Sequence, residues 1–126
     1  MRVVTRKTFL TLPDGTLFCK GKPWAFEELA VKTASRIGEG NDLGDFCYQS
    51  FRDIPCADSG EYIDRLEMML NEGKSYPLEL DSSSRDGCFD NDDIFLVYDY
   101  EDIVRLRDYL SDILIGHNEA DTFSPI

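Results

Sequence analysis

The 126-residue sequence lacks the residue groupings on which most catalytic sites are built. It has one histidine, His117, no glycine-rich nucleotide-binding pattern and no nucleophile elbow. His117 stands at the end of the last predicted helix, where the helix dipole favours a cation, so we interpret it as a solvated residue rather than a general base. Acid–base catalysis needs two carboxyl groups in different environments, and no pair among the 25 acidic residues stands out in that way. We therefore expect no catalytic residue and no cofactor.

Long apolar segments and closely spaced cysteines are also absent. No apolar run approaches the length of a membrane-spanning helix, and no apolar stretch of suitable length follows the basic N-terminus, so we expect no membrane association and a cytoplasmic location. The four cysteines are Cys19, Cys47, Cys56 and Cys88. They include no closely spaced pair of the kind that zinc sites use, and we expect reduced, mostly buried thiols. Only the geometry can show whether Cys47 and Cys56 meet across a hairpin.

Negative charge is abundant, and it is unevenly distributed. Residues 1–38 contain seven Lys or Arg and three Asp or Glu. Residues 39–126 contain six Lys or Arg and 22 Asp or Glu, and the net charge of the whole chain is −12. The N-terminal cations are Arg2, Arg6, Lys7, Lys20, Lys22, Lys32 and Arg36. Basic residues mixed with aromatic residues are one pattern of single-strand nucleic-acid binding. However, the negative charge of residues 39–126 repels the phosphate backbone, so we expect no direct nucleic-acid binding. We expect these cations to pair with the acidic part of the same molecule, or of a second copy in an oligomer.

Length and composition predict one domain. With 42% hydrophobic residues the chain has enough apolar material for one core, which excludes a disordered protein. We expect an α+β domain over residues 1–116 and a flexible C-terminal tail over residues 117–126.

The first half of the chain predicts three strands. Pro13-Asp14-Gly15 is a turn, because proline presets φ and glycine accepts a positive φ. The strands are expected at residues 16–20, 24–33 and 46–51, with a glycine-rich loop at residues 38–45 between the last two. Residues 27–30 are equally compatible with a helix.

The second half predicts two amphipathic helices around one strand. The first helix follows Asp58, which has the spacing of a capping box with Glu61, and it stops at Gly73. Residues 77–80 are a candidate short strand, and the apolar run at residues 94–98 predicts a strand in the middle of the sheet. Asp99 caps a second helix that ends at Gly116. We expect a small, mostly antiparallel sheet with both helices packed on one face. The residues expected to be buried are Leu66, Leu70, Leu96, Leu106 and Leu110.

An Asp-rich loop at residues 81–93 is the most polar segment of the chain. Counted from Ser82, it has glycine at the sixth position and oxygen-bearing side chains at several ligand positions of a calcium loop. Three features argue against a calcium site in this loop: serine at the first and third positions, the positive charge of Arg85, and a strand rather than a helix after the loop. We expect no metal site, and we expect this loop to be a solvated turn that contributes little to stability.

Two stretches resemble a known group of proteins. FLTLPDGTLF at residues 9–18, with KGKPW at residues 20–24, resembles the opening of small uncharacterised proteins encoded by tailed bacteriophages and prophages. RDGCFD at residues 85–90, ahead of an apolar strand and a last helix, is also similar. The resemblance implies a small accessory protein made in an infected or lysogenic bacterium, and it assigns no catalytic or ligand residues.

Two functions of different class fit these features. The first is a non-enzymatic acidic interaction protein that binds a basic or nucleic-acid-binding host protein, since an array of carboxylates can mimic phosphate spacing. Its candidate binding residues, within the acidic segment 79–102, are Asp86, Asp90, Asp92, Asp93, Asp99, Glu101 and Asp102. The alternative is a small ligand- or metal-binding module or enzyme that uses the loop 81–93. A concave pocket with converging polar groups favours the alternative, whereas a flat or convex acidic face favours the interaction protein. The same acids are also typical of a surface that only keeps a protein soluble.

Overall fold

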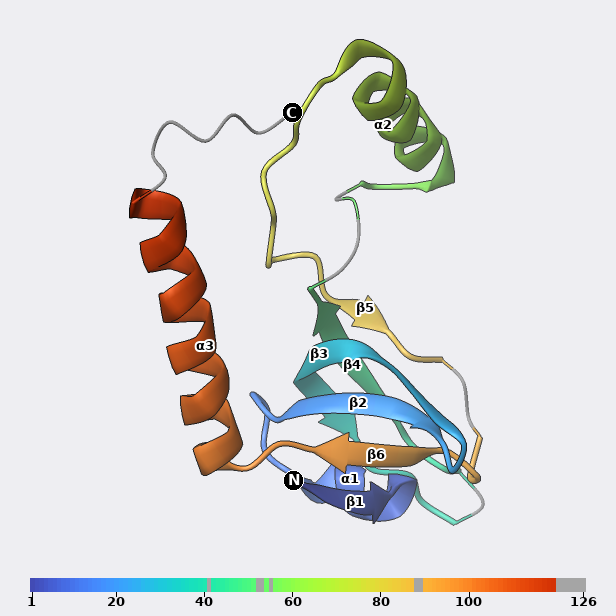
Figure 1. Ribbon diagram of the computed structural model, residues 1–126. Coiled ribbons are helices and arrows are strands. Elements are labelled where there is room, and N and C mark those ends of the chain that lie inside the picture. The colour runs from blue at the N-terminus through green and yellow to red at the C-terminus, as the bar shows by residue number, and fades with distance from the viewer. Residues whose placement is uncertain (41, 52–53, 55, 88–89, 120–126) are drawn as a thin grey trace.

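The computed structural model describes residues 1–40, 42–51, 54, 56–87 and 90–119 (Figure 1). Six strands and three helices follow one another in the order β1 (Arg2–Thr5), α1 (Arg6–Thr11), β2 (Leu17–Lys22), β3 (Ala25–Arg36), β4 (Asp45–Ser50), α2 (Ser59–Glu72), β5 (Ser84–Arg85), β6 (Ile94–Val97) and α3 (Tyr100–Glu119). This is an α+β fold, as the sequence predicts.

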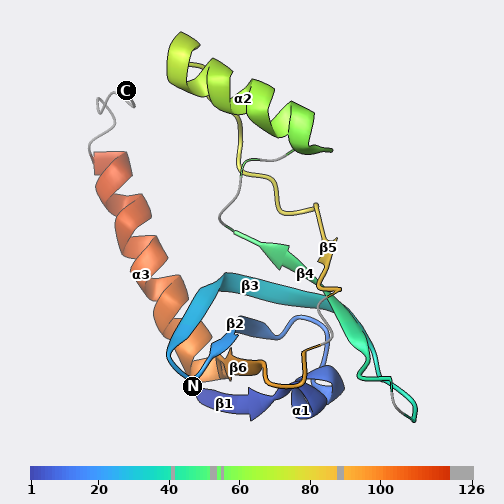
Figure 2. The ribbon, with the colours of Figure 1, turned by 90° about the vertical axis from the view of Figure 1, so that its right-hand side faces the viewer.

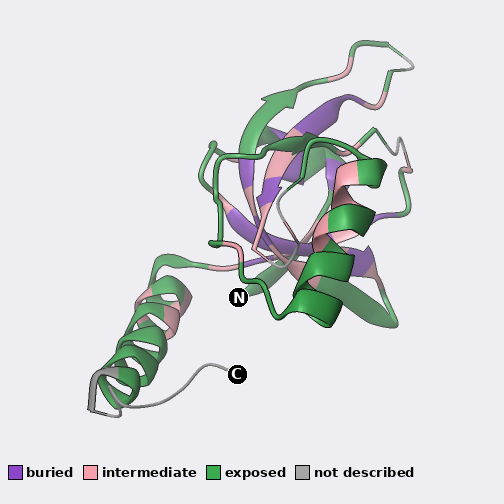
Figure 3. Ribbon diagram, turned by 90° about the horizontal axis from the view of Figure 1, so that it is seen from above, coloured by how far each residue is buried: buried purple, intermediate pink, exposed green. Residues whose placement is uncertain are grey.

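All six strands form one antiparallel sheet in the order β1-β6-β2-β3-β4-β5. Figures 2 and 3 show that the sheet is strongly curved, and Figure 2 shows α1 beside β1 and β6. The long strand β3 has an extra residue against β4 between Lys32 and Ala34, and another against β2 between Phe26 and Leu29. Such bulges bend a strand and increase its twist, which lets a sheet of this size curl around its own core.

The short helix α1 fills the inner side of the sheet. Thr5 caps its first turn, because the Thr5 hydroxyl accepts a hydrogen bond from the amide of Thr8, and the helix ends before Pro13. Its last carbonyl groups receive a cation from another element: the buried Lys32 ammonium of β3 donates to the carbonyls of Phe9, at 3.1 Å, and Leu12. A positive group favours a helix C-terminus, so Lys32 fixes α1 against the sheet.

Four phenylalanine rings form the centre of the core. Phe9 of α1 is fully buried, and its ring stacks on that of Phe95 with centroids 4.1 Å apart. Phe18 and Phe46 pack around the Phe9 ring at 4.7 and 5.0 Å. Leu10, Ala30 and Val97 complete the cluster.

Most predicted elements are confirmed. The turn at Pro13 has Gly15 at φ +90°, the three early strands lie at the predicted places within a few residues, and β6 has a neighbouring strand on each side. Asp58 caps α2 by accepting from the Glu61 amide at 2.8 Å, and Gly73 ends it in the left-handed conformation. Asp99 precedes α3, and its amide donates to the Asp102 carboxylate at 2.9 Å.

The predicted packing of the two long helices on the sheet is wrong. The apolar stripe of α2 contains no buried residue, and Leu66 and Leu70 are 38% and 74% exposed. On α3, Leu110 is 55% exposed and Leu106 is half-buried, as is Leu96 of β6. In Figures 1 and 2 both helices stand apart from the sheet. The inner side of the sheet is covered instead by α1, which the sequence did not predict and which buries Phe9 and Leu10 in the core.

Smaller differences concern the ends of elements and the thiols. The sequence did not predict β1, and the short strand predicted at residues 77–80 is not present in the described backbone. The helix α3 continues past Gly116 to Glu119, because glycine is tolerated inside a helix. The predicted tail thus begins inside α3, and residues 120–126 lie outside the described residues. Cys19 is buried, Cys47 is half-buried and Cys56 is exposed, and all three are free thiols. Cys88 is outside the described residues.

Candidate functional site

A cluster of ion pairs joins α1, β2 and β4 to the Asp-rich loop, and the buried Arg6 is at its centre. The Arg6 side chain is 1% exposed. Its guanidinium donates to the Asp86 carboxylate at 3.1 Å and to the carbonyl of Gly44 at 3.2 Å, and it lies 3.7 and 3.8 Å from Asp45 and Asp93. A buried charge requires such partners, because desolvation without them costs several kcal/mol.

Two lysines of β2 extend this cluster. Lys20 contacts Asp86 at 2.9 Å and Asp93 at 3.5 Å, and Lys22 contacts Asp90 at 2.5 Å and Asp93 at 2.9 Å. The hydrogen bonds that Lys22 donates to Asp90 and then to Asp93 raise the pKa of Lys22 above its usual value. Alternation along β2 directs Lys20 to the same side as Phe18, so the strand brings these cations to the edge of the core.

Asp45 connects the cluster to β5. Burial by itself raises the pKa of this carboxyl, but hydrogen bonds from Arg85 and from the amides of Phe46 and Gly87 outweigh burial, so the pKa is lowered. The amide of Asp86 in turn donates to the carbonyl of Phe46 at 2.9 Å. These bonds hold the start of the Asp-rich loop against β4.

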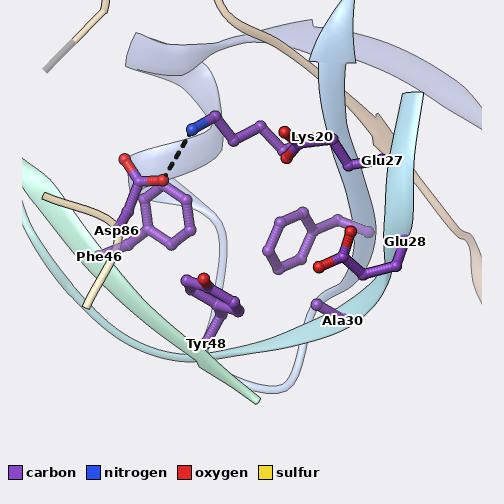
Figure 4. A pocket seen from close by; sticks show the side chains of 8 residues that line it. Lys20, Glu27, Glu28, Ala30, Phe46, Tyr48 and Asp86 are labelled. Atoms are coloured by element: carbon purple, nitrogen blue, oxygen red, sulfur yellow. Dashed lines mark hydrogen bonds and ion pairs between the residues drawn. The ribbon is translucent and has the colours of Figure 1, made fainter. Parts of the chain in front are cut away.

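A concave pocket of about 370 Å³ opens beside the cluster, on the core side of the sheet. Its lining residues come from β2, β3, β4 and the segment after β5, and they are Phe18, Lys20, Glu27, Glu28, Ala30, Phe46, Tyr48 and Asp86. Figure 4 shows Asp86 and Phe46 across the hollow from Glu28, with the Lys20–Asp86 ion pair along one side. The pocket therefore combines an aromatic lining with charged groups, and its volume lies near the lower end of the range of about 300–1,000 Å³ for small-ligand sites.

Most of the charged groups that line the pocket are acidic, and Arg6 and Lys20 neutralise one of them, Asp86. Three carboxylates, from Glu27, Glu28 and Asp86, line the pocket together with one ammonium, from Lys20. Tyr48 lies in the same pocket: burial raises the pKa of its phenol most, Asp86 and Glu28 raise it further, and Lys20 lowers it. The net effect is an increase, so the surroundings of the phenol disfavour a negative charge there.

The predicted acidic binding residues do not form one surface. The Asp86 and Asp93 side chains are 5% and 4% exposed and belong to the ion-pair cluster, and Asp90 is bonded to Lys22. Asp92 is exposed. The loop 81–93 is therefore not a uniformly solvated turn, because three of its carboxylates neutralise buried or half-buried cations.

The remaining candidates lie at the base of α3. The Asp102 carboxylate binds the N-terminal ammonium at 2.8 Å, Asp99 lies 3.6 Å from Arg2, and Glu101 is exposed. Five of the seven N-terminal cations thus have acidic partners in the same molecule, as the charge distribution predicts; they are Arg2, Arg6, Lys20, Lys22 and Arg36. This pairing leaves few of these cations for a second copy.

Sequence reasoning missed Glu27, Glu28, Phe46 and Tyr48 as site residues. Alternation along β3 places Glu28 on the same side as Ala30 and Lys32, but it does not show which side faces the core, and the register irregularity at Glu27 and Glu28 brings both to the pocket. A charged residue directed toward a core needs a partner or a site.

No metal site and no membrane helix are found in the described part of the chain. Among those residues, no group of three or more His, Cys, Asp or Glu is placed to hold a metal ion. None of the helices within them combines the length and apolarity that crossing a membrane requires.

Comparison with models of protein families, with curated proteins and with solved structures gives no significant match to this chain.

Proposed function

We propose that this chain is a non-enzymatic binding protein whose pocket between β2, β3 and β4 accepts a cationic side chain, lysine or arginine, from a basic protein. The observation that supports this most directly is the composition of the pocket. Glu27 and Glu28 line it besides Asp86, whose charge is matched by the Arg6 guanidinium at 3.1 Å and the Lys20 ammonium at 2.9 Å. The half-buried Tyr48, backed by the buried Phe18 and Phe46, supplies apolar surface for the methylene stem of such a side chain and an aromatic face that attracts a cation.

The proposal combines parts of both sequence-based hypotheses. It keeps the basic partner of the first, and it takes from the second a concave pocket with converging polar groups. Recognition is assigned to this pocket rather than to the acidic segment 79–102, because Asp86 and Asp93 are engaged with Arg6 and Lys20. The expected cytoplasmic setting and the phage or prophage origin are part of the proposal, and the sequence resemblance is the support for that origin.

Titration with a short lysine- and arginine-containing peptide tests the proposal. In two-dimensional NMR spectra we expect the peptide to shift the aromatic signals of Phe18, Phe46 and Tyr48. An acidic peptide of the same length should leave them unchanged. Replacing Glu27 and Glu28 together by Gln should weaken binding about 10-fold, since it removes two of the three carboxylates that line the pocket.

A matched control separates the pocket from the overall charge. The double variant Asp92→Asn, Glu101→Gln changes the net charge by the same amount, and both residues are exposed and outside the pocket lining. It should bind the peptide nearly as well as the parent protein. If both double variants weaken binding equally, or if the shifted signals lie away from the pocket, the assignment to this site is wrong.

A further inference from the structure

The helix α3 carries an apolar stripe with the spacing of a coiled coil. Ile103, Leu106, Leu110 and Ile113 follow at intervals of three, four and three residues, which are the a, d, a and d positions of a heptad repeat. The outward-facing positions of the same heptads are mostly polar or charged: Arg105, Asp108, Ser111 and Asp112. This spacing matches a partner helix of the same period rather than the surface of a sheet.

Most of the stripe is uncovered in the described structure, and Leu106 is half-buried. Ile103, Leu110 and Ile113 are 41%, 55% and 44% exposed, and a shallow hollow along the helix is lined only by residues of α3. In Figures 1 and 2 the helix stands apart from α2 and from the sheet. An exposed apolar surface of this kind on a charged, water-soluble helix marks an interaction site.

The residues that flank the stripe indicate the partner. In a parallel pair of identical helices, a residue at g faces the residue five positions later, at e, on the other helix. Here these positions bring Asp102 opposite Arg107 and Tyr109 opposite Leu114, one pair of opposite charges and one apolar pair. The Asp102 Oδ2 atom binds the N-terminal ammonium, whereas Oδ1 has a contact of 3.9 Å with Arg105 and remains able to accept from Arg107 of another copy.

We propose that a second copy of this chain covers the stripe, with the two α3 helices packed in parallel through Ile103, Leu106, Leu110 and Ile113. An antiparallel pair would place neither Arg107 nor Asp102 opposite a charge of the other sign. An anionic membrane surface fits less well, because the polar face of the helix carries Asp108 and Asp112 rather than a row of lysines. The dimer is independent of the pocket and of its proposed ligand.

Sedimentation and light scattering of the full chain test the dimer. The parent protein should associate with increasing concentration, and Leu110→Ser should raise the dissociation constant at least about 10-fold, since two leucines leave the seam of each dimer. Ile115→Ser is the matched control: Ile115 is 53% exposed on the same helix but lies at the outward f position. It should associate like the parent.

Circular dichroism and the urea midpoint show whether either variant has lost its fold. A parent protein that stays monomeric at high concentration contradicts the proposal. So does a folded Leu110→Ser variant that still dimerises with the affinity of the parent.

The parallel arrangement has its own test. In a parallel pair residue 113 faces itself, so Ile113→Cys should form a dimer linked by a disulfide under mild oxidation, above the background of the parent cysteines. Ile115→Cys should not. If the protein dimerises but Ile113→Cys does not cross-link, the parallel arrangement is wrong.

Discussion

At the scale of single residues, this protein depends on a buried arginine. Arg6 is 1% exposed and is surrounded by Asp45, Asp86 and Asp93, which come from distant parts of the chain. Replacing such a network by apolar residues can be neutral, but removing one partner leaves a buried charge uncompensated. The Asp-rich loop is therefore a structural element as well as an acidic segment.

We predict that Asp93→Asn lowers the free energy of unfolding by about 2–3 kcal/mol. This is less than the loss of about 3–5 kcal/mol for a fully buried isolated pair, because Lys20 and Lys22 are partly solvated and Asp86 remains. Asp92→Asn, in the same loop but exposed, should change the stability by less than about 0.5 kcal/mol. Urea unfolding of both variants measures the difference. Equal stabilities would mean that Asp93 does not hold this cluster together.

The carboxyl groups with lowered pKa values predict sensitivity to acid. Arg36, Lys22 and the N-terminal ammonium lower the pKa values of Asp42, Asp90 and Asp102 by hydrogen bonding, and Asp45 is lowered by its bonds despite burial. A lowered folded-state pKa contributes stability that is present above the unfolded value, about 3.9, and is lost as the pH falls through the folded value.

We therefore expect the free energy of unfolding to fall steadily below about pH 4. In Asp45→Asn this fall should be smaller, because one of the contributing groups has been removed. Urea unfolding at a series of pH values between neutrality and strong acid measures this loss of stability for both proteins. If the parent protein were equally stable at both ends of this range, the lowered pKa values would not contribute to its stability.

At the scale of elements, the short helix α1 has more influence on the core than the two long helices. Helix propensity and amphipathic spacing are strong in α2 and α3, yet their apolar stripes are exposed. In contrast, α1 has only six residues, and it contributes the fully buried Phe9 ring to the centre of the core. A helix this short is unstable by itself, so the sheet and Lys32 must hold it in place.

We predict that Phe9→Ala costs about 3–5 kcal/mol of folding free energy, as is typical of a buried phenylalanine, and leaves a cavity between Phe18, Phe46 and Phe95. Leu70→Ala on α2 should cost far less, because Leu70 is 74% exposed. Thermal or urea unfolding compares the two. A large loss for Leu70→Ala would show that α2 packs against something that this structure does not contain.

At the scale of the whole molecule, the net charge of −12 acts on binding rather than on the fold. Most N-terminal cations are neutralised internally, so an approaching basic partner meets a surface with excess negative charge. Salt screens this attraction over about 10 Å at 0.1 M.

Accordingly, association of the basic peptide should slow steeply as salt is added, whereas its dissociation should change less. Stopped-flow measurements at low and high salt separate the two rates. Because net charge attracts at long range, the Asp92→Asn, Glu101→Gln control should slow association modestly, while the Glu27→Gln, Glu28→Gln variant should also dissociate faster. An association rate that does not depend on salt would exclude electrostatic steering.

The sequence by itself determined much of the local structure of this protein. Alternating apolar residues, the cap at Asp58 and the turn at Gly15 depend on neighbours in the chain, and β2, β3, β4, β6 and the long helices lie close to their predicted positions, whereas β1, α1 and β5 were not predicted. The excess of cations in residues 1–38 also predicted pairing with the acidic half, because opposite charges in one compact molecule rarely stay apart.

Only the tertiary structure decided which faces are buried and where the pocket lies. Both sides of β3 carry apolar and charged residues, so periodicity could not show that Ala30 and Lys32, with Glu28, face the core side. The curvature of the sheet placed α1 inside it, left the stripes of α2 and α3 exposed, and brought Glu28, Tyr48 and Asp86 around one hollow. These outcomes depend on contacts between residues far apart in the chain, and no local pattern in the sequence encodes them.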